Sequence, residues 1–126
     1  MRRLPVSTAK APAAVGPYSQ GVHAGAHVFV SGQIPLDAKG QMVAGGIAEQ
    51  TQQCLLNVRE VLLAAGLTME HVMKVSVFMT DLGQFAAMNE VYAKHFIAPY
   101  PARAAVQVAA LPKGALIEIE VVALKP

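Results

Sequence analysis

Residues 47–66, IAEQTQQCLLNVREVLLAAG, and residues 72–79, VMKVSVFM, decide the fold class of this chain. In the first stretch apolar residues recur at helical spacing, and Gly66 stands where a helix C-terminal glycine belongs. The inward-facing set of this helix comprises Ile47, Thr51, Cys54, Leu55, Val58, Leu62 and Ala65. In the second stretch apolar and polar residues alternate, which is typical of a half-buried strand.

The rest of the chain predicts a second helix and further strands. Asp81 is a good N-cap for that helix, and Pro99 and Pro101 end it. Its apolar stripe consists of Phe85, Met88, Tyr92 and Phe96. Further strands are predicted over residues 4–8, 18–22, 27–31, 103–109 and 116–124. The order β-β-β-α-β-α-β-β predicts one α+β domain over residues 1–126, a mixed sheet with both helices on one face.

The alternation along the last two strands predicts where their charged side chains lie. If the helices cover the isoleucines of residues 117–124, then Glu118 and Glu120 lie on the uncovered face with Val122 and Leu124. On the preceding strand, placing the apolar residues 104, 106 and 108 under the helices puts Arg103 on the same uncovered face as Glu118, across a hairpin turn. A sheet face that mixes aliphatic side chains with an arginine and two carboxylates suits neither a buried core nor a surface in contact with solvent. We therefore expect a partner subunit to cover this face, with a cleft between the two subunits.

Composition narrows the classes of function and partner. The 126 residues are 54% hydrophobic and 14% charged, with a net charge of +2, and the apolar surplus hints at a surface covered by a second copy. No apolar run approaches the roughly 18 residues of a membrane span, and the first residues do not read as a secretory signal. The single cysteine, Cys54, fits a reducing compartment, so we expect a cytoplasmic protein with a buried, inert thiol.

The distribution of basic residues and histidines argues against nucleic-acid binding and against a metal site. The ten Lys and Arg residues are scattered, and no basic stripe indicates a nucleic-acid groove. The four histidines have no metal-ligand spacing, so we expect no metal site.

A set of short motifs follows in order along the chain. They are GPYSQG at 16–21, SGQIP at 31–35, QTQQCLLN at 50–57, KVSVFMTD at 74–81, FAAMN at 85–89, PARAAVQVAAL at 101–111 and IEIE at 117–120. Each piece alone is a weak signal, but the ordered set, from about residue 13 to residue 123, is specific. It resembles the signature of the RidA (reactive intermediate deaminase, YjgF/UK114) family.

The resemblance implies a chorismate-mutase-like α+β fold that forms a homotrimer, with active sites in the clefts between subunits. It implies hydrolysis of 2-imino (enamino) acids, such as 2-iminobutanoate and 2-iminopropanoate, to 2-oxo acids and ammonia without a cofactor. It also implies that Arg103 binds the substrate carboxylate and that Glu118 handles water.

Physical chemistry supports those two roles. Because an imine is already electrophilic at C2, two tasks remain: to hold the carboxylate and to activate a water. An arginine fork binds a carboxylate bidentately, and a positioned carboxylate base typically contributes about 10²- to 10⁴-fold in rate. The plain alternative for Arg103 is that it is an exposed charge or forms a salt bridge with Glu120. The plain alternative for Glu118 is that it simply lies on the solvent-exposed face of its strand. Glu120 is also the rival for the role of base.

Five further residues are candidates for substrate binding. Tyr18 could line the cleft or be a packed strand tyrosine, and Asn89 could hydrogen-bond in the cleft or lie on a helix surface. Ser31 and Gly32 could offer a hydroxyl and a backbone N–H to the carboxylate, or simply end a strand. Ala105 would contribute its backbone N–H. Many members of the family carry a cysteine at this position, so thiol chemistry is impossible here and the substrate range is open.

Two other functions stay open at this point. One is a ribonuclease or translation inhibitor, against which the missing basic patch and aromatic array argue. The other is a non-catalytic trimer that binds small carboxylates or acts as a chaperone, which would need Arg103 but not Glu118.

Overall fold

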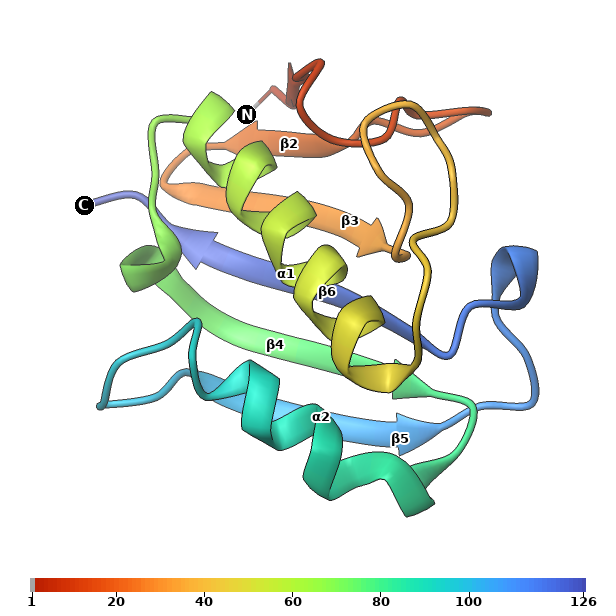
Figure 1. Ribbon diagram of the computed structural model, residues 1–126. Helices are drawn as coiled ribbons and strands as arrows, with labels where there is room; N and C mark the ends of the chain where they lie inside the picture. Colours follow the sequence, from red (N-terminus) through yellow and green to blue (C-terminus); the bar gives the residue numbers. More distant parts are fainter. Residues whose placement is uncertain (1) are drawn as a thin grey trace.

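The computed structural model describes residues 2–126, so Met1 of the predicted domain lies outside the described residues. The strands are β1 (Leu4–Val6), β2 (Gly21–Ala24), β3 (His27–Gln33), β4 (Val72–Met79), β5 (Ala102–Gln107) and β6 (Ile117–Leu124). The helices are α1 (Ile47–Ala64) and α2 (Phe85–Tyr92). The strands form one mixed sheet in the order β1-β2-β3-β6-β4-β5, and both helices lie on the same face of it (Figure 1). The predicted element order and α+β architecture are confirmed.

The core lies between the helices and the face of the sheet that they cover. α1 contributes Leu55, Val58 and Leu62, and β6 contributes Ile117 and Ile119, all without exposed surface. Burying each such side chain stabilises the fold by about 1.5–3 kcal/mol, so the alternation along β6 fixes which of its faces turns inward. Glu118 and Glu120 consequently lie on the uncovered face, as predicted.

α1 ends at Ala64, and the predicted glycine follows its C-cap residue, Ala65. Gly66 has a φ of +81°, in the left-handed region that favours glycine. The Leu67 N–H donates to the carbonyl of Leu62 at 2.8 Å, and the Gly66 N–H donates to that of Leu63 at 3.0 Å. These two bonds satisfy carbonyls that a helix end would otherwise leave free.

Several element boundaries differ from the prediction. β1, β3 and β5 differ by one or two residues at their ends, and α2 ends at Tyr92, before Phe96 and the two prolines that were expected to end it. Two further differences have a visible cause. Asp81 does cap a helical turn, accepting from the Gly83 N–H at 2.8 Å, but this is a separate 3₁₀ turn (Leu82–Gln84) before α2. The predicted strand over 18–22 begins only at Gly21. The reason is that the Gln20 side chain bonds to the backbone of Thr8 and of Pro12, which holds the preceding segment as a loop.

The predicted hairpin between the last two strands is wrong. β5 pairs with β4 in parallel, and β6 lies between β3 and β4, antiparallel to both. Since α2 connects β4 to β5, the three elements form a strand–helix–strand crossover, which returns the chain in the same direction. β4 therefore separates β5 from β6.

The predicted phase of β5 is also wrong. Arg103 and Ala105 pair with Val75 and Val77 of β4, which are fully buried under the helices, so these β5 residues share the helix-bearing face. Val106 lies on the opposite face and is 46% exposed. Arg103 and Glu118 thus lie on opposite faces of the sheet within one chain. A membrane-spanning helix is not found among residues 2–126.

Candidate functional site

Arg103 lies at the start of the edge strand β5, against α2. Its Nη1 donates a hydrogen bond to Oδ1 of Asn89 at 2.7 Å. The guanidinium carbon lies 4.7 Å from the centre of the Tyr92 ring and 5.2 Å from that of Phe85. These distances are within the range at which a cation is attracted to an aromatic face. Three side chains of α2 therefore hold this guanidinium.

The positive charge of Arg103 is not neutralised within the chain. Among residues 2–126 the only ion pair joins Arg59 to Glu60, at 3.6 Å. A shallow hollow of about 510 Å³ adjoins the guanidinium and is lined by Leu82, Phe85, Arg103 and Ala105. The arrangement can bind a small anion that carries an apolar group, since a guanidinium fork matches a carboxylate.

Glu118 lies on β6, on the face that the helices leave uncovered, and pairs in register with Phe78 of β4. It is half-buried, and this burial raises the pKa of its carboxyl; the nearby charge of Glu120 raises it further. A carboxyl with a raised pKa is better matched to proton transfer near neutral pH. Glu120 is exposed. Of the two glutamates, Glu118 is the more buried.

Ser31 and Gly32 form a β-bulge beside that carboxylate. Val30 pairs with Val121 and Gln33 with Ile119, so two residues of β3 oppose one residue of β6. A Cβ on Gly32 would lie 2.7 Å from Oε2 of Glu118. Only glycine leaves room there for the Glu118 side chain.

Ser31 and Tyr18 connect the bulge to the loop before β2. The Ser31 hydroxyl donates to the carbonyl of Ser19 at 2.6 Å, so its proton is already used within the chain. The neighbouring Tyr18 is 53% exposed, and its hydroxyl oxygen accepts from the Val15 N–H at 3.4 Å. The Tyr18 O–H can still donate to a ligand, whereas Ser31 offers lone pairs rather than a proton.

The structure thus brings the predicted site residues together in two groups. Arg103, Asn89 and Ala105 lie on the helix-bearing side, and Glu118 and Gly32 lie on the uncovered face with the Ser31 bulge. Glu118 is in register with Phe78 of β4 and, through it, with Val106 of β5, which lies three residues from Arg103. The backbones of Arg103 and Glu118 are therefore two strand spacings, about 10 Å, apart across the sheet and three residues, about 10 Å, apart along it. One chain cannot present both side chains to one small molecule.

The sequence interpretation missed three neighbours of Arg103. Phe85 and Tyr92 were assigned only to the apolar stripe of the second helix, and Leu82 was not singled out. The available signal was the spacing of Phe85, Asn89 and Tyr92, which puts all three on one helix side. An arginine at the start of the next strand can reach that side.

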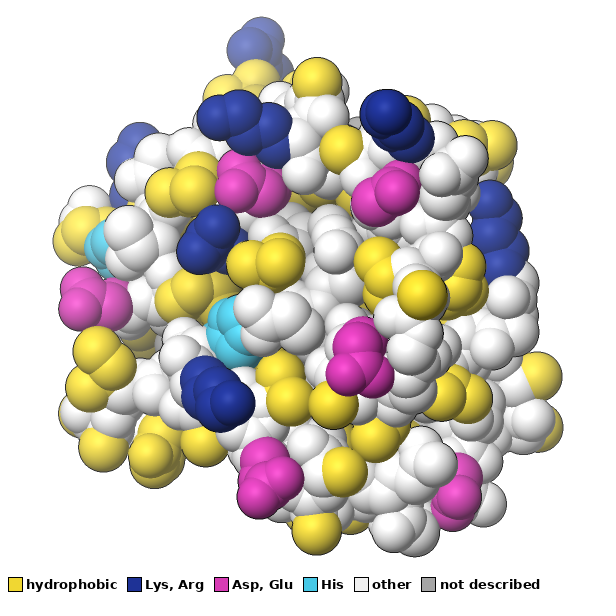
Figure 2. Space-filling view, viewed as in Figure 1, with side chains coloured by type: hydrophobic (Ala, Val, Ile, Leu, Met, Phe, Trp, Pro, Cys, Tyr) yellow, Lys and Arg dark blue, Asp and Glu magenta, His cyan; other side chains and the backbone are white. Residues whose placement is uncertain are grey.

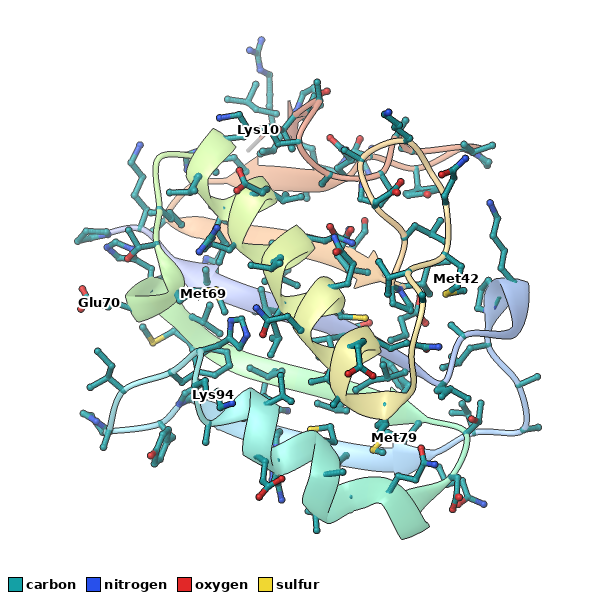
Figure 3. The ribbon with its side chains drawn as sticks, viewed as in Figure 1. Lys10, Met42, Met69, Glu70, Met79 and Lys94 are labelled. Carbon is teal, nitrogen blue, oxygen red and sulfur yellow. The ribbon has the colours of Figure 1, made fainter. Side chains whose placement is uncertain are left out.

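Other features lie away from both groups. A larger hollow, of about 880 Å³, is bounded by the end of α1, the turn before β4 and residues 95–102. Met69 and Glu70 lie on that turn, and Lys94 follows α2 (Figure 3). Burial, and then the charge of Glu118, raise the pKa of Cys54, which is the buried thiol that we predicted. Within residues 2–126 no three His, Cys, Asp or Glu side chains gather to hold a metal.

The helix-bearing face has no concentration of positive charge. Figure 2 shows Lys and Arg side chains interspersed with Asp and Glu over this face. A continuous basic stripe, as nucleic-acid binding requires, is missing from it.

Comparison with known proteins identifies relatives across nearly the whole chain. Residues 8–125 match the model of a family described as Endoribonuclease L-PSP. A goat protein named 2-iminobutanoate/2-iminopropanoate deaminase is 49% identical over 126 residues, covering 99% of this chain and 91% of the goat protein. The crystal structure of yeast Mmf1 has a TM-score of 0.96 at 42% identity, covering 99% of this chain and 100% of Mmf1. The structure of E. coli TdcF with bound serine has a TM-score of 0.91 at 42% identity, covering 98% and 99% of the two chains.

Proposed function

The chain belongs to the RidA family, and from that membership we propose that it is an enzyme that hydrolyses reactive 2-imino acids to 2-oxo acids and ammonia, without a cofactor. Its 49% identity to the goat deaminase over nearly the whole of both chains supports this assignment. The observation that carries it is Arg103, a cation held without an acidic partner beside a mainly apolar hollow. A short 2-imino acid matches that hollow, because it combines a carboxylate with a small apolar side chain.

In this proposal Arg103 binds the substrate carboxylate through two parallel N–H donors and thereby fixes the position of C2. The bound serine of TdcF, which also carries a carboxylate, is consistent with such a role. Asn89 and Ala105 complete the Arg103 side of the site. Tyr18, Ser31 and Gly32 complete the Glu118 side, where Gly32 makes room for the carboxylate.

Glu118 acts on water. It takes a proton from a water molecule as the water oxygen attacks C2, and the C=N electron pair moves to nitrogen. The proton then passes to that nitrogen, which gives a carbinolamine with a C2 hydroxyl and an amino group. As the C–N bond breaks, the proton of the C2 hydroxyl passes by way of Glu118 to the departing nitrogen, so that ammonia leaves and a C=O group remains. The imine is electrophilic by itself, so base catalysis and positioning are sufficient. The raised pKa of Glu118, caused by burial and then by Glu120, suits a group that must both accept and return a proton.

The complete site forms between two copies of the chain. Since Arg103 and Glu118 lie on opposite faces of one sheet, Arg103 of one copy works with Glu118 of a neighbour. The uncovered face also carries Phe29, Val106 and Leu124, which are 42%, 46% and 39% exposed. Apolar side chains gathered on one face favour its burial against another copy. We propose that the copies form a closed homotrimer with three equivalent sites.

The test is the decay of 2-iminobutanoate generated in situ by an amino-acid oxidase or dehydratase. We expect wild type to accelerate both the decay and the release of ammonia, and Arg103→Ala to lose that acceleration. Identical decay with wild type, Arg103→Ala and no protein would refute the proposal. Binding of 2-oxobutanoate without turnover would instead favour a non-catalytic carboxylate-binding trimer.

Two further points belong to the proposal. Because a single cysteine, Cys54, forms no disulfide within the chain, it favours a location in the cytoplasm, which is a reducing compartment. The family description also names an endoribonuclease, and RNA cleavage that survives repurification and is abolished by Arg103→Ala would favour that activity.

A further inference from the structure

α2 presents three side chains to Arg103, and only Asn89 makes a hydrogen bond of standard geometry with it. Asn89 accepts from Nη1 at 2.7 Å, and the rings of Phe85 and Tyr92 lie 5.2 and 4.7 Å from the guanidinium carbon. Phe85 and Tyr92 are seven residues apart, nearly two helical turns, with Asn89 between them. Their common placement on one helix side follows from the helical period.

The chemistry of this support differs from that of a structural arginine. An arginine that supports only the fold is usually paired with a carboxylate, which neutralises its charge and occupies two of its donors. Arg103 itself is exposed. Here aromatic faces and one neutral amide hold the guanidinium, and within residues 2–126 it has no carboxylate partner. Ring faces attract the cation without occupying its N–H groups. Four of the five N–H donors of Arg103 are left for a ligand.

Tyr92 has a second feature that fits a support role. The residue is 6% exposed, and its hydroxyl makes no hydrogen bond of standard geometry within the chain. Burial raises the pKa of this hydroxyl, and the charge of Arg103 and then a weak hydrogen bond with its guanidinium offset part of that effect. A buried hydroxyl without a well-formed hydrogen bond adds little to stability, so the main contact of Tyr92 with Arg103 is its ring face.

Resting on the proposed function, we propose that Phe85 and Tyr92 are positioning residues, which hold the Arg103 guanidinium by their ring faces so that its free N–H groups meet the substrate carboxylate. Neither residue touches the reacting atoms. Their contribution is to orientation: a long, flexible side chain on an edge strand is fixed before the substrate arrives, and less entropy is lost on binding.

The experiment measures the binding of 2-oxobutanoate, and the specificity constant kcat/KM with 2-iminobutanoate as substrate, in two backgrounds, wild type and Arg103→Ala. Phe85→Leu and Tyr92→Leu each remove one ring. In the wild-type background we expect each to weaken binding about 3- to 30-fold, from the strength of a cation–ring contact. In the Arg103→Ala background, where the cation is missing, neither should weaken binding further or lower the specificity constant further.

Three controls separate positioning from general damage. Tyr92→Phe keeps the ring and should bind 2-oxobutanoate within about twofold of wild type, with a higher Tm because a buried hydroxyl without a well-formed hydrogen bond is gone. Phe96→Leu removes a comparably buried ring, 4.7 Å from the Tyr92 ring, that does not stack on Arg103. It should lower the Tm and leave binding within about twofold. Phe85 is only half-buried, so Phe85→Leu keeps the test decisive if Tyr92→Leu does not fold.

The outcomes distinguish the two claims. If Arg103→Ala weakens binding but the ring variants do not, or weaken it equally in both backgrounds, the positioning role is overturned and the proposed function stands. If Arg103→Ala binds and turns over like wild type, the carboxylate role of Arg103 fails, and the positioning role fails with it.

Discussion

Gly32→Ala tests the proposed role of Glu118 without replacing Glu118 itself. The added Cβ would lie 2.7 Å from Oε2, 2.9 Å from Cδ and 3.2 Å from Cγ of Glu118. Ordinary contacts to a Cβ begin at 3.4 Å, so the carboxylate must move by at least about 0.7 Å. A displacement of about 1 Å in a catalytic group can cost about 100-fold in rate, and we expect kcat for 2-iminobutanoate to fall by about that factor.

The same substitution should leave substrate binding and stability nearly unchanged. Arg103, which is proposed to bind the carboxylate, comes from the neighbouring copy and is held there by its own α2, so KM should stay within a few-fold. Replacing glycine by alanine inside a strand also restricts the unfolded chain, which offsets part of the steric cost by about 0.5–1 kcal/mol. Gly46→Ala is the matched control, since a Cβ there meets nothing within 4 Å. Full kcat in a folded Gly32→Ala protein would refute the assignment of Glu118 as base.

Three further predictions concern charge and stability. Because the charge of Glu120 contributes to the raised pKa of Glu118, Glu120→Gln should lower that pKa and move the acid limb of the kcat/KM profile to lower pH; an unmoved limb would assign it to another group. Since a raised folded-state pKa means that ionised Glu118 opposes folding, Glu118→Gln should raise the Tm at pH 8. That gain should shrink as pH falls through the Glu118 pKa, and a pH-independent difference would contradict it. Gly66→Ala, at a φ of +81°, should cost about 1 kcal/mol of unfolding free energy in a urea titration with unchanged kcat, and no loss would contradict the left-handed cap.

The sequence was a reliable guide wherever burial imposed a strong pattern. The alternation of Val75, Val77 and Met79, and of the isoleucines of β6, corresponds to side chains without exposed surface or nearly so. Gly66 was recognisable because a left-handed residue is needed after a helix and glycine adopts it at the lowest cost. The uncovered placement of Glu118 followed from the same alternation.

β5 defeated the same reasoning for two physical reasons. Its residues 102–107 include three alanines, which fit a buried or an exposed face equally well, so the alternation carried little information. Arg103 was assumed to avoid the helix-bearing face because it is charged, yet aromatic rings and an amide of α2 accommodate it there. The strand–helix–strand order of residues 72–107 did contain a signal for parallel pairing, which would have excluded the hairpin.

The site could be predicted as a set of residues but not as an arrangement. Residue types and motifs selected Arg103, Glu118 and Gly32, and the structure puts Gly32 against Glu118. The division of the set between two faces depends on the phase of β5, and the alanines of that strand leave its phase open in the sequence.

A mixture of two inactive variants tests most directly whether the site is shared between copies. Arg103→Ala and Glu118→Gln, each purified alone, are denatured together in equal amounts and refolded, and ammonia release from 2-iminobutanoate is measured. If each site takes Arg103 from one copy and Glu118 from the next, about one site in four regains both native residues, and activity should return to about a quarter of wild type. Activity no higher than that of the separate variants, with mixed oligomers demonstrated by mass, would contradict the shared site.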